Sequence, residues 1–150
     1  MPTRLKDFST LMVAVVEPET PALKAAQLMR QHHIGALVVV DAKEQSRPVG
    51  ILTDRDLVIA LMAEGLDPEL FTAGDIMSVE LVQANPDMDA MDAIELMRAN
   101  RLRRLVLVDE LGRLVGIVTM EDILALMTRE LAALAAGVIG ARDREFEQRR

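Results

Sequence analysis

Two stretches of one pattern combine a hydroxyl and a carboxylate at a fixed spacing. They are Gly50–Leu57, which reads Gly-Ile-Leu-Thr-Asp-Arg-Asp-Leu, and Gly116–Ile123, which reads Gly-Ile-Val-Thr-Met-Glu-Asp-Ile. Each predicts a short strand that runs through a Thr into a helix, with an Asp three positions after the Thr. The free N–H groups of a helix start bind phosphate, and a carboxylate accepts hydrogen bonds from a diol. The chain therefore carries two candidate half-sites for a ligand that contains a phosphate and a diol.

The same residues also have a purely structural interpretation. Thr53 and Thr119 are suitable helix N-caps, and Asp56 and Asp122 stand where a capping box places its acidic partner. A Thr and an Asp at this spacing occur widely beside helix starts. At the level of the motif alone, both interpretations stay open.

An internal repeat positions the two motifs. With an offset of 68, residues 5–41 match residues 73–109 at 11 of 37 positions, and with an offset of 66, residues 48–62 pair with residues 114–128. The first copy therefore has two extra residues in the polar loop 42–47, where insertions cost little. Self-similarity of this kind indicates two copies of one structural unit.

Each copy predicts the order strand, helix, strand, strand, helix. Pro18 and Pro86 end the first strand of each copy, because proline cannot continue a β ladder. The first copy is predicted to have a strand at 13–16, a helix at 21–31, strands at 34–40 and 49–52, and a helix from 54 to about 63. The second copy is predicted to have a strand at 81–84, a helix at 88–99, strands at 104–108 and 114–118, and a helix from 121.

Neither copy alone can cover both faces of a three-stranded sheet. We therefore expect an α/β fold in which the two copies pack together around a pseudo-two-fold axis. The predicted parts are a first repeat at residues 5–63, a linker at 64–72, a second repeat at 73–130 and a C-terminal helical extension with a charged tail at 131–150.

The extension continues the last helix. Its apolar spacing predicts packing against a partner helix, either in the same pair of repeats or in a second copy of the chain. Gly137 and Gly140 are expected to loosen the helix, and Ala141–Arg150 is expected to fray.

Composition argues against several classes of function. The net charge is −7, with 24 acidic and 17 basic residues, so non-specific binding to nucleic acid or to an anionic membrane is not expected. The segment Met1–Phe8 lacks the apolar core of a signal peptide. No run reaches the roughly 18 uninterrupted apolar residues of a membrane helix. These features favour a cytoplasmic protein.

The chain lacks the residues that catalytic and metal sites usually need. With three Ser, two adjacent His, no Cys and no Tyr, the chain offers no obvious set of nucleophile, base and orienting group, and it has no Gly-rich phosphate loop. His32 and His33 point about 100° apart on a helix end, and no third His or Cys completes a metal site. We expect a protein that is not an enzyme and holds no metal, although chemistry by carboxylates alone is not excluded.

The duplicated pattern resembles the CBS (cystathionine β-synthase) domain. The resemblance covers residues 5–130 and rests on both Thr-x-x-Asp stretches, the openings 6–8 and 74–77, the prolines at 18 and 86, and the Leu-Met-Arg helices at 28–30 and 96–98. It implies two βαββα repeats that form a Bateman module, which usually assembles as a homodimer. It also implies a regulatory role without catalysis, in which AMP, ADP, ATP or S-adenosylmethionine binds between the repeats and an effector protein reads the occupancy.

The resemblance also assigns roles to the two motifs. Asp56 and Asp122 correspond to the carboxylates that bind the ribose hydroxyls, and Thr53 and Thr119 to the hydroxyls on the phosphate side. A constitutive interaction scaffold, with empty or vestigial clefts, is the alternative function. It differs from a sensor in showing no response to nucleotides.

A basic pair distinguishes the two copies. Arg103 and Arg104 precede the central strand of the second copy, where the family often places residues that reach the nucleotide phosphate, and Gly35 and Ala36 hold the same places in the first copy. Arginine matches phosphate oxygens with two parallel donors, whereas Gly35 and Ala36 offer only backbone and shape. We expect unequal clefts, with tighter binding of a phosphorylated adenosine beside the arginines. Because both arginines belong to the second copy, the Thr and Asp of the first copy are expected to lack basic partners. The alternative is a pair of solvated surface arginines.

Overall fold

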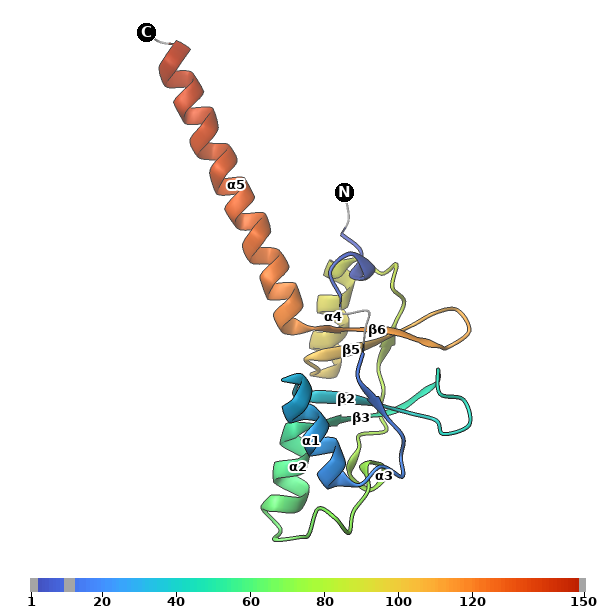
Figure 1. The fold of residues 1–150 in the computed structure, drawn as a ribbon. Coiled ribbons are helices and arrows are strands. Elements are labelled where there is room, and N and C mark those ends of the chain that lie inside the picture. The colour runs from blue at the N-terminus through green and yellow to red at the C-terminus, as the bar shows by residue number, and fades with distance from the viewer. Residues whose placement is uncertain (1–2, 10–12, 149–150) are drawn as a thin grey trace.

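The computed structural model describes residues 3–9 and 13–148 (Figure 1). A short helical turn, η1 (Leu5–Asp7), comes first. The next elements are β1 (Val15–Val16), α1 (Ala22–His32), β2 (Ala36–Val40), β3 (Pro48–Thr53), α2 (Asp54–Leu57) and the π-helical η2 (Val58–Met62). The remaining elements are α3 (Ala73–Ile76), β4 (Gln83–Ala84), α4 (Ala90–Asn100), β5 (Arg104–Val108), β6 (Leu114–Thr119) and α5 (Met120–Gln148).

The predicted α/β fold with two tandem repeats is confirmed. Each repeat has a three-stranded sheet whose middle strand pairs in parallel with the short first strand and antiparallel with the third. Val38 in β2, for example, lies opposite Val15 on one side and Ile51 on the other. The antiparallel pairs of both sheets have an irregular register at the same place. The two repeats therefore share one backbone plan.

Apolar residues of the middle strands hold the two repeats together. Val38, Val40 and Val106 are buried in one cluster, which Leu81 and Ile117 help to cover. Because β2 and β5 are rich in β-branched residues, each can pack one face on its own helices and the other on the opposite sheet. The surface between the repeats is therefore part of the core.

The opening segment of each copy packs in the core of the other copy. Leu5 is fully buried among Ala93 and Met97 of the second repeat, and its N–H donates to the Met88 carbonyl oxygen at 3.0 Å. In the same way Ala73 is buried in the first repeat, and its N–H donates to the Thr20 carbonyl oxygen at 2.7 Å. The repeats defined by sequence are therefore not separate bodies in space.

Several predicted boundaries differ from the structure. β1 and β4 each contain only two residues, so both strands are shorter than predicted. The helix predicted from residue 54 to about 63 begins as α2 and continues as η2, where the Ala63 N–H donates to the Val58 carbonyl oxygen five residues earlier at 2.8 Å. Residues 64–72 form turns without a helix or a named strand.

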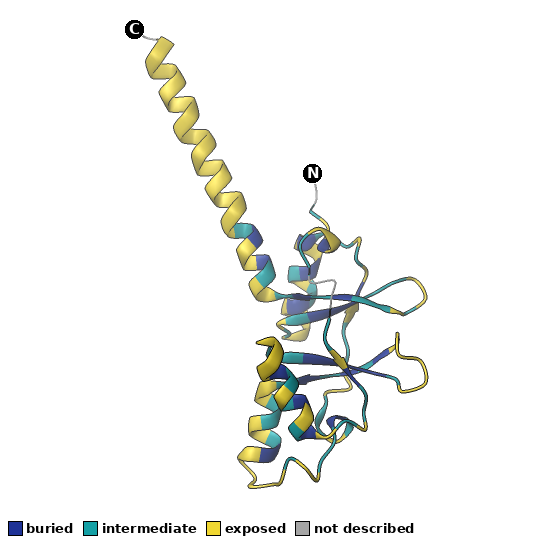
Figure 2. Ribbon diagram, viewed as in Figure 1, coloured by how far each residue is buried: buried dark blue, intermediate teal, exposed yellow. Residues whose placement is uncertain are grey.

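The expected fraying of the C-terminus is wrong within the described residues. α5 runs without a break to Gln148, past Gly137 and Gly140. Each glycine costs about 1 kcal/mol relative to alanine, but the surrounding Ala, Leu, Arg and Glu residues are strong helix formers. α5 leaves the body of the molecule (Figure 1), and its outer part is exposed (Figure 2).

α5 is also long and apolar enough to cross a membrane, judged by length and composition only. One such helix is weak evidence for a membrane span.

Candidate functional site

Both Thr-x-x-Asp motifs form complete capping boxes. The Asp56 N–H donates to Thr53 Oγ1 at 3.1 Å, and the Thr53 N–H donates to Asp56 Oδ2 at 2.9 Å. Thr119 and Asp122 make the same two hydrogen bonds at the same distances. The structural interpretation of the motifs is therefore confirmed. Any ligand would have to bind to residues that already hold the starts of α2 and α5.

A third capping box shows how little the motif says by itself. The Thr72 N–H donates to Asp75 Oδ2 at 2.8 Å, and the Asp75 N–H donates to Thr72 Oγ1 at 3.3 Å, at the start of α3. This pair lines none of the cavities described below. The case for a binding site at Thr53 and Asp56 therefore depends on the side chains around them and not on the capping box.

A cavity of about 170 Å³ joins the predicted residues of both repeats. Thr53 and Asp56 line it from the first repeat, and Arg103 and Arg104 line it from the second. The rest of its wall consists of Ile51, Ser78, Glu80, Leu81, Val82, Leu102 and Val106. The expectation that Thr53 and Asp56 lack basic partners is therefore wrong, because the arginines reach across the boundary between the repeats.

Strand pairing fixes the backbone that carries the two arginines. β5 pairs with β6 so that Arg104 lies opposite Thr119, and the Arg103 carbonyl oxygen accepts a hydrogen bond from the Met120 N–H at 2.8 Å. The backbone of this segment is thus held by its own repeat. The two side chains extend from it into the cavity that Thr53 and Asp56 complete. Thr119 and Asp122 do not line this cavity.

The equivalent place in the other half of the molecule is different. Ala36 lies opposite Thr53, and the Gly35 carbonyl oxygen accepts the Asp54 N–H at 2.9 Å. A Cβ at Gly35 would lie 3.0 Å from Asp54 Oδ2, so the position has little room for a larger side chain.

The nearby cavity of about 500 Å³ is lined by Val13, Ala14, Val15, Leu28, His32 and Ile34 among the described residues. Thr119 and Asp122 are not among those residues. Positions 10–12, which correspond to Ser78–Glu80, lie outside the described residues. Among the described residues, the structure therefore brings together Thr53, Asp56, Arg103 and Arg104 in one cavity.

The chemistry of the arginine-lined cavity suits an anion with hydroxyl groups. Arg103 is exposed and Arg104 is partly buried, so both guanidinium groups can meet a phosphate without a large loss of hydration. Among the described residues, the hydrogen bond that Asp56 accepts goes to Oδ2, which leaves Oδ1 for a ribose hydroxyl. Glu80 adds a second carboxylate that the sequence comparison of the two copies did not single out.

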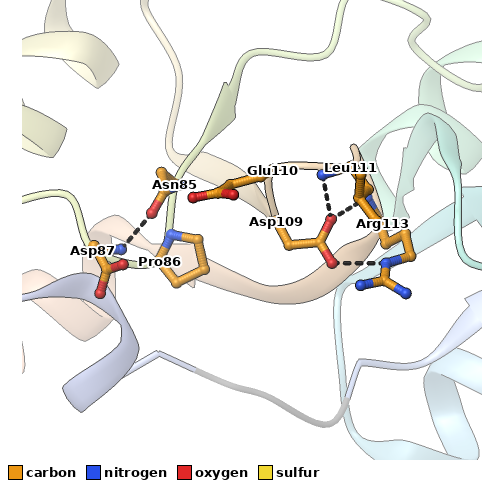
Figure 3. Close-up of a pocket in the computed structure, with 7 residues that line it drawn as sticks. All are labelled: Asn85, Pro86, Asp87, Asp109, Glu110, Leu111 and Arg113. Atoms are coloured by element: carbon orange, nitrogen blue, oxygen red, sulfur yellow. Dashed lines mark hydrogen bonds and ion pairs between the residues drawn. The ribbon is translucent and has the colours of Figure 1, made fainter.

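A second cavity, of about 350 Å³, is lined by acidic residues but has a structural explanation (Figure 3). The Arg113 N–H and guanidinium lower the pKa of Asp109, which closes the turn between β5 and β6. The Lys6 ammonium likewise lowers the pKa of Asp87. These carboxylates are used to hold the turn and the N-terminal segment.

No group of three or more His, Cys, Asp or Glu side chains that could hold a metal ion occurs among residues 3–9 and 13–148. His32 ends α1, and His33 adopts the left-handed conformation that terminates the helix. Arg101 terminates α4 in the same way. The His pair therefore occupies a helix end with an equivalent in the second repeat.

Sequence reasoning missed most of the cavity wall. Ser78 pairs with Ile51 through two backbone hydrogen bonds of 3.0 and 2.9 Å, and this bridge brings the chain after α3 into the cleft. The offset of 68 between the copies does not indicate this bridge, because the offset relates equivalent positions and not positions in contact. Only pairing across the repeats reveals these residues.

Residues 5–63 and 73–129 each match the sequence model of the CBS domain. Uncharacterized protein MK0525 from Methanopyrus kandleri is 44% identical over 107 residues, which cover 71% of this chain and 54% of that protein. CBS domain-containing protein YhcV from Bacillus subtilis is 43% identical over 119 residues, which cover 79% of this chain and 81% of that protein. The chain thus spans about half the length of the first relative and most of the second.

A solved structure shares the fold. CBS domain protein PAE2072 from Pyrobaculum aerophilum, complexed with AMP, superposes with a TM-score of 0.74 at 22% identity. The match covers 80% of this chain and 89% of that one.

Proposed function

The chain belongs to the CBS domain family, and from this we propose that it is a non-catalytic regulatory module that binds an adenosine nucleotide in its arginine-lined cleft. We define this cleft by Thr53, Asp56, Arg103 and Arg104. AMP, ADP and ATP are the candidate ligands, and S-adenosylmethionine is a further one. The occupancy of the cleft would be read by an effector protein or by assembly of the chain, in the cytoplasm.

One observation carries this proposal. A helix start with a hydroxyl and a carboxylate, from the first repeat, lines the same cavity as two arginines from the second. Phosphate is bound best by charge-assisted donors, and a ribose diol by a carboxylate oxygen. The cavity contains both kinds of group, contributed by different parts of the chain.

In the proposed complex, Arg103 and Arg104 bind the phosphate and Asp56 accepts hydrogen bonds from the ribose. Thr53 and the N–H groups at the start of α2 lie on the phosphate side. The chain has no Trp or Tyr, so apolar side chains of the cavity, including Ile51, Leu81 and Val82, would hold the base.

The size of the cavity adds a requirement. At about 170 Å³ it is smaller than the roughly 300 to 1,000 Å³ of common small-molecule sites. A whole nucleotide would therefore extend out of the open side of the cavity unless the arginine side chains turn outward or the repeats shift. A ligand that requires such a shift acts on the equilibrium between two arrangements of the repeats, which is how occupancy would be transmitted.

The same small size favours the second candidate function, a constitutive scaffold. Asp56 is already used as a capping residue, so the cleft has a structural role without any ligand. A scaffold would bind its partner with the same affinity whether or not a nucleotide is present.

Thermal unfolding with a panel of ligands separates the two functions. A ligand at 100 times its Kd stabilises the folded state by about 2.7 kcal/mol. We expect a rise in Tm with AMP, ADP or ATP in the wild type, and a smaller rise when Arg103 and Arg104 are both replaced by Ala. NADH and S-adenosylmethionine complete the panel. No response to any of the five ligands would favour the scaffold.

A further inference from the structure

The outer part of α5 carries an apolar stretch that no other element covers in the described part of the chain. Every residue from 128 to 148 is exposed, and 21 residues of helix extend about 31 Å. Leu131, Leu134 and Val138 are 67, 66 and 61% exposed. An exposed apolar surface of this kind is typical of an interaction site.

The apolar residues form a stripe with a seven-residue period. Leu124, Leu131 and Val138 form one series, and Met127, Leu134 and Ala141 form a second, offset by three positions. Alternating spacings of three and four place both series on one side of a helix, as in a two-helix coiled coil. Met127 packs against the core of the second repeat, so the free part of the stripe consists of Leu131, Leu134, Val138 and Ala141. We call these four residues the α5 seam, and they predict another helix as their partner.

The length of the apolar block argues against a lipid bilayer. Residues 131–141 contain no polar or charged side chain and extend about 16 Å, roughly half of a hydrocarbon core. Arg129 and Glu130 precede the block, and Arg142 and Asp143 follow it. A membrane span would have to bury one of these charged pairs in lipid.

We propose that the α5 seam binds the α5 seam of a second copy of the chain, with the two helices antiparallel. With the apolar blocks aligned about Ala136, Leu131 lies level with Ala141 of the second copy and Leu134 lies level with Val138. Each layer then joins a large residue to a smaller one.

Charge complementarity selects the antiparallel arrangement. Glu130 and Arg144 are 14 residues apart and flank the seam on the same side. In the antiparallel pair, Glu130 of each copy lies beside Arg144 of the other, so two opposite-charge contacts form by symmetry. In a parallel pair in register the two Glu130 residues lie level with each other but on opposite flanks of the seam, as do the two Arg144 residues, so neither opposite-charge contact forms.

Disulfide trapping tests the arrangement directly, since the chain contains no cysteine. The full chain is prepared as Leu134→Cys with a tag and as Val138→Cys without one, and the two are mixed and oxidised. The antiparallel seam predicts that the mixed disulfide is the main product. Disulfides mainly within each variant, as a parallel pair would form, would overturn the proposal. No disulfide at all would also overturn it, including the case in which the chain floats with phosphatidylcholine vesicles instead.

Charge reversal gives an independent test that leaves the folded body untouched. We expect Glu130→Arg or Arg144→Glu alone to raise the dimer dissociation constant about tenfold in sedimentation equilibrium, because both contacts become repulsive. The mixture of the two single variants restores opposite charges in both contacts and should form a heterodimer as tight as the wild type. Equal self-association of all variants and of their mixture would overturn the proposed register. Neither experiment needs a nucleotide, so failure here is distinct from failure of the proposed function.

Discussion

The two repeats have the same architecture but differ in the residues before their middle strands. Both sheets have the same strand order, both helix starts carry the same capping box, and α1 and α4 both end in a left-handed residue. The first repeat has Gly35 and Ala36 where the second has Arg103 and Arg104. The duplicated parts build the fold, and we assign the ligand preference to the part that diverged.

The comparison also shows that a residue of one repeat can line a cavity together with residues of the other. Arg104 lies opposite Thr119 in the sheet, yet it lines a cavity with Thr53. Each cleft therefore has to be described by residues from both copies. The predictions below test whether the two clefts differ as this description requires.

Removal of both arginines should have the largest effect. We expect Arg103→Ala with Arg104→Ala to weaken AMP binding about 100-fold, because hydrogen bonds between charged groups contribute about 1.5 to 3 kcal/mol each. Calorimetric titration measures this. Arg47→Ala, in an exposed loop, is the matched control and should leave the affinity unchanged. A similar loss in the control would indicate a general effect of net charge.

Replacing the two equivalent aspartates should separate binding from capping. Asp56→Asn is expected to weaken AMP binding about tenfold, and Asp122→Asn to leave it unchanged, since only Asp56 lines the arginine-lined cleft. Both variants should lose about 1 kcal/mol or less of stability in urea, because both weaken the same kind of cap. Equal loss of AMP affinity in the two variants would contradict the difference between the clefts.

Transfer of one arginine should make the clefts more alike. Ala36 occupies the register position in the first sheet that Arg104 occupies in the second. We expect Ala36→Arg to add a weaker second binding event for AMP, with an affinity several-fold below that of the first. Gly35 is unsuitable for this test because a Cβ there would press on Asp54. An unchanged stoichiometry would show that the second cleft lacks more than an arginine.

The loss of stability at low pH is expected to differ least between the two repeats. Backbone N–H groups of Glu44 and Lys43 lower the pKa of Asp41, as the N–H and guanidinium of Arg113 lower that of the equivalent Asp109. Both carboxylates therefore contribute stability above the unfolded pKa of about 3.8, and the contribution is lost as the pH falls through the folded pKa.

We expect Asp41→Asn and Asp109→Asn each to reduce the loss of stability between pH 5 and pH 2, by similar small amounts, in urea titrations. A steeper loss of stability in either variant would show that its carboxyl is not stabilised by these hydrogen bonds.

The sequence predicts the fold well because the repeat and the β-branched runs leave few alternatives. The bounds of the middle strands are predicted to within about two residues. The apolar run from Ile34 to Val40 is too continuous for a surface element, so it predicts a strand that is covered on both faces. The two glycines predict a weak end for α5, but the helix continues to Gln148 because the many helix formers around them offset a cost of about 1 kcal/mol each. The exposure of α5 depends on which elements pack beside the helix, and the spacing of its apolar residues does not show this.

The grouping of the site residues was also beyond the sequence. The motif and the arginines are visible as residue types, but sequence adjacency suggested that Arg103 and Arg104 serve the Thr and Asp of their own copy. In the structure they instead line a cavity with Thr53 and Asp56, and Ile51 and Ser78, which pair across the repeats, line the same cavity. Contacts of this kind follow from the packing of the two sheets and leave no periodic signal.

Calorimetric titration of AMP into a cross-repeat mutant cycle tests the central claim most directly. The cycle contains the wild type, Asp56→Asn, the double Arg103→Ala and Arg104→Ala variant, and their combination, with Asp122→Asn as reference. We predict one strong site per chain that both changes weaken, with a combined loss that differs from the sum, because the two groups bind one ligand. Unchanged AMP binding in the Asp56 and arginine variants, or an equal loss in Asp122→Asn, would contradict the account.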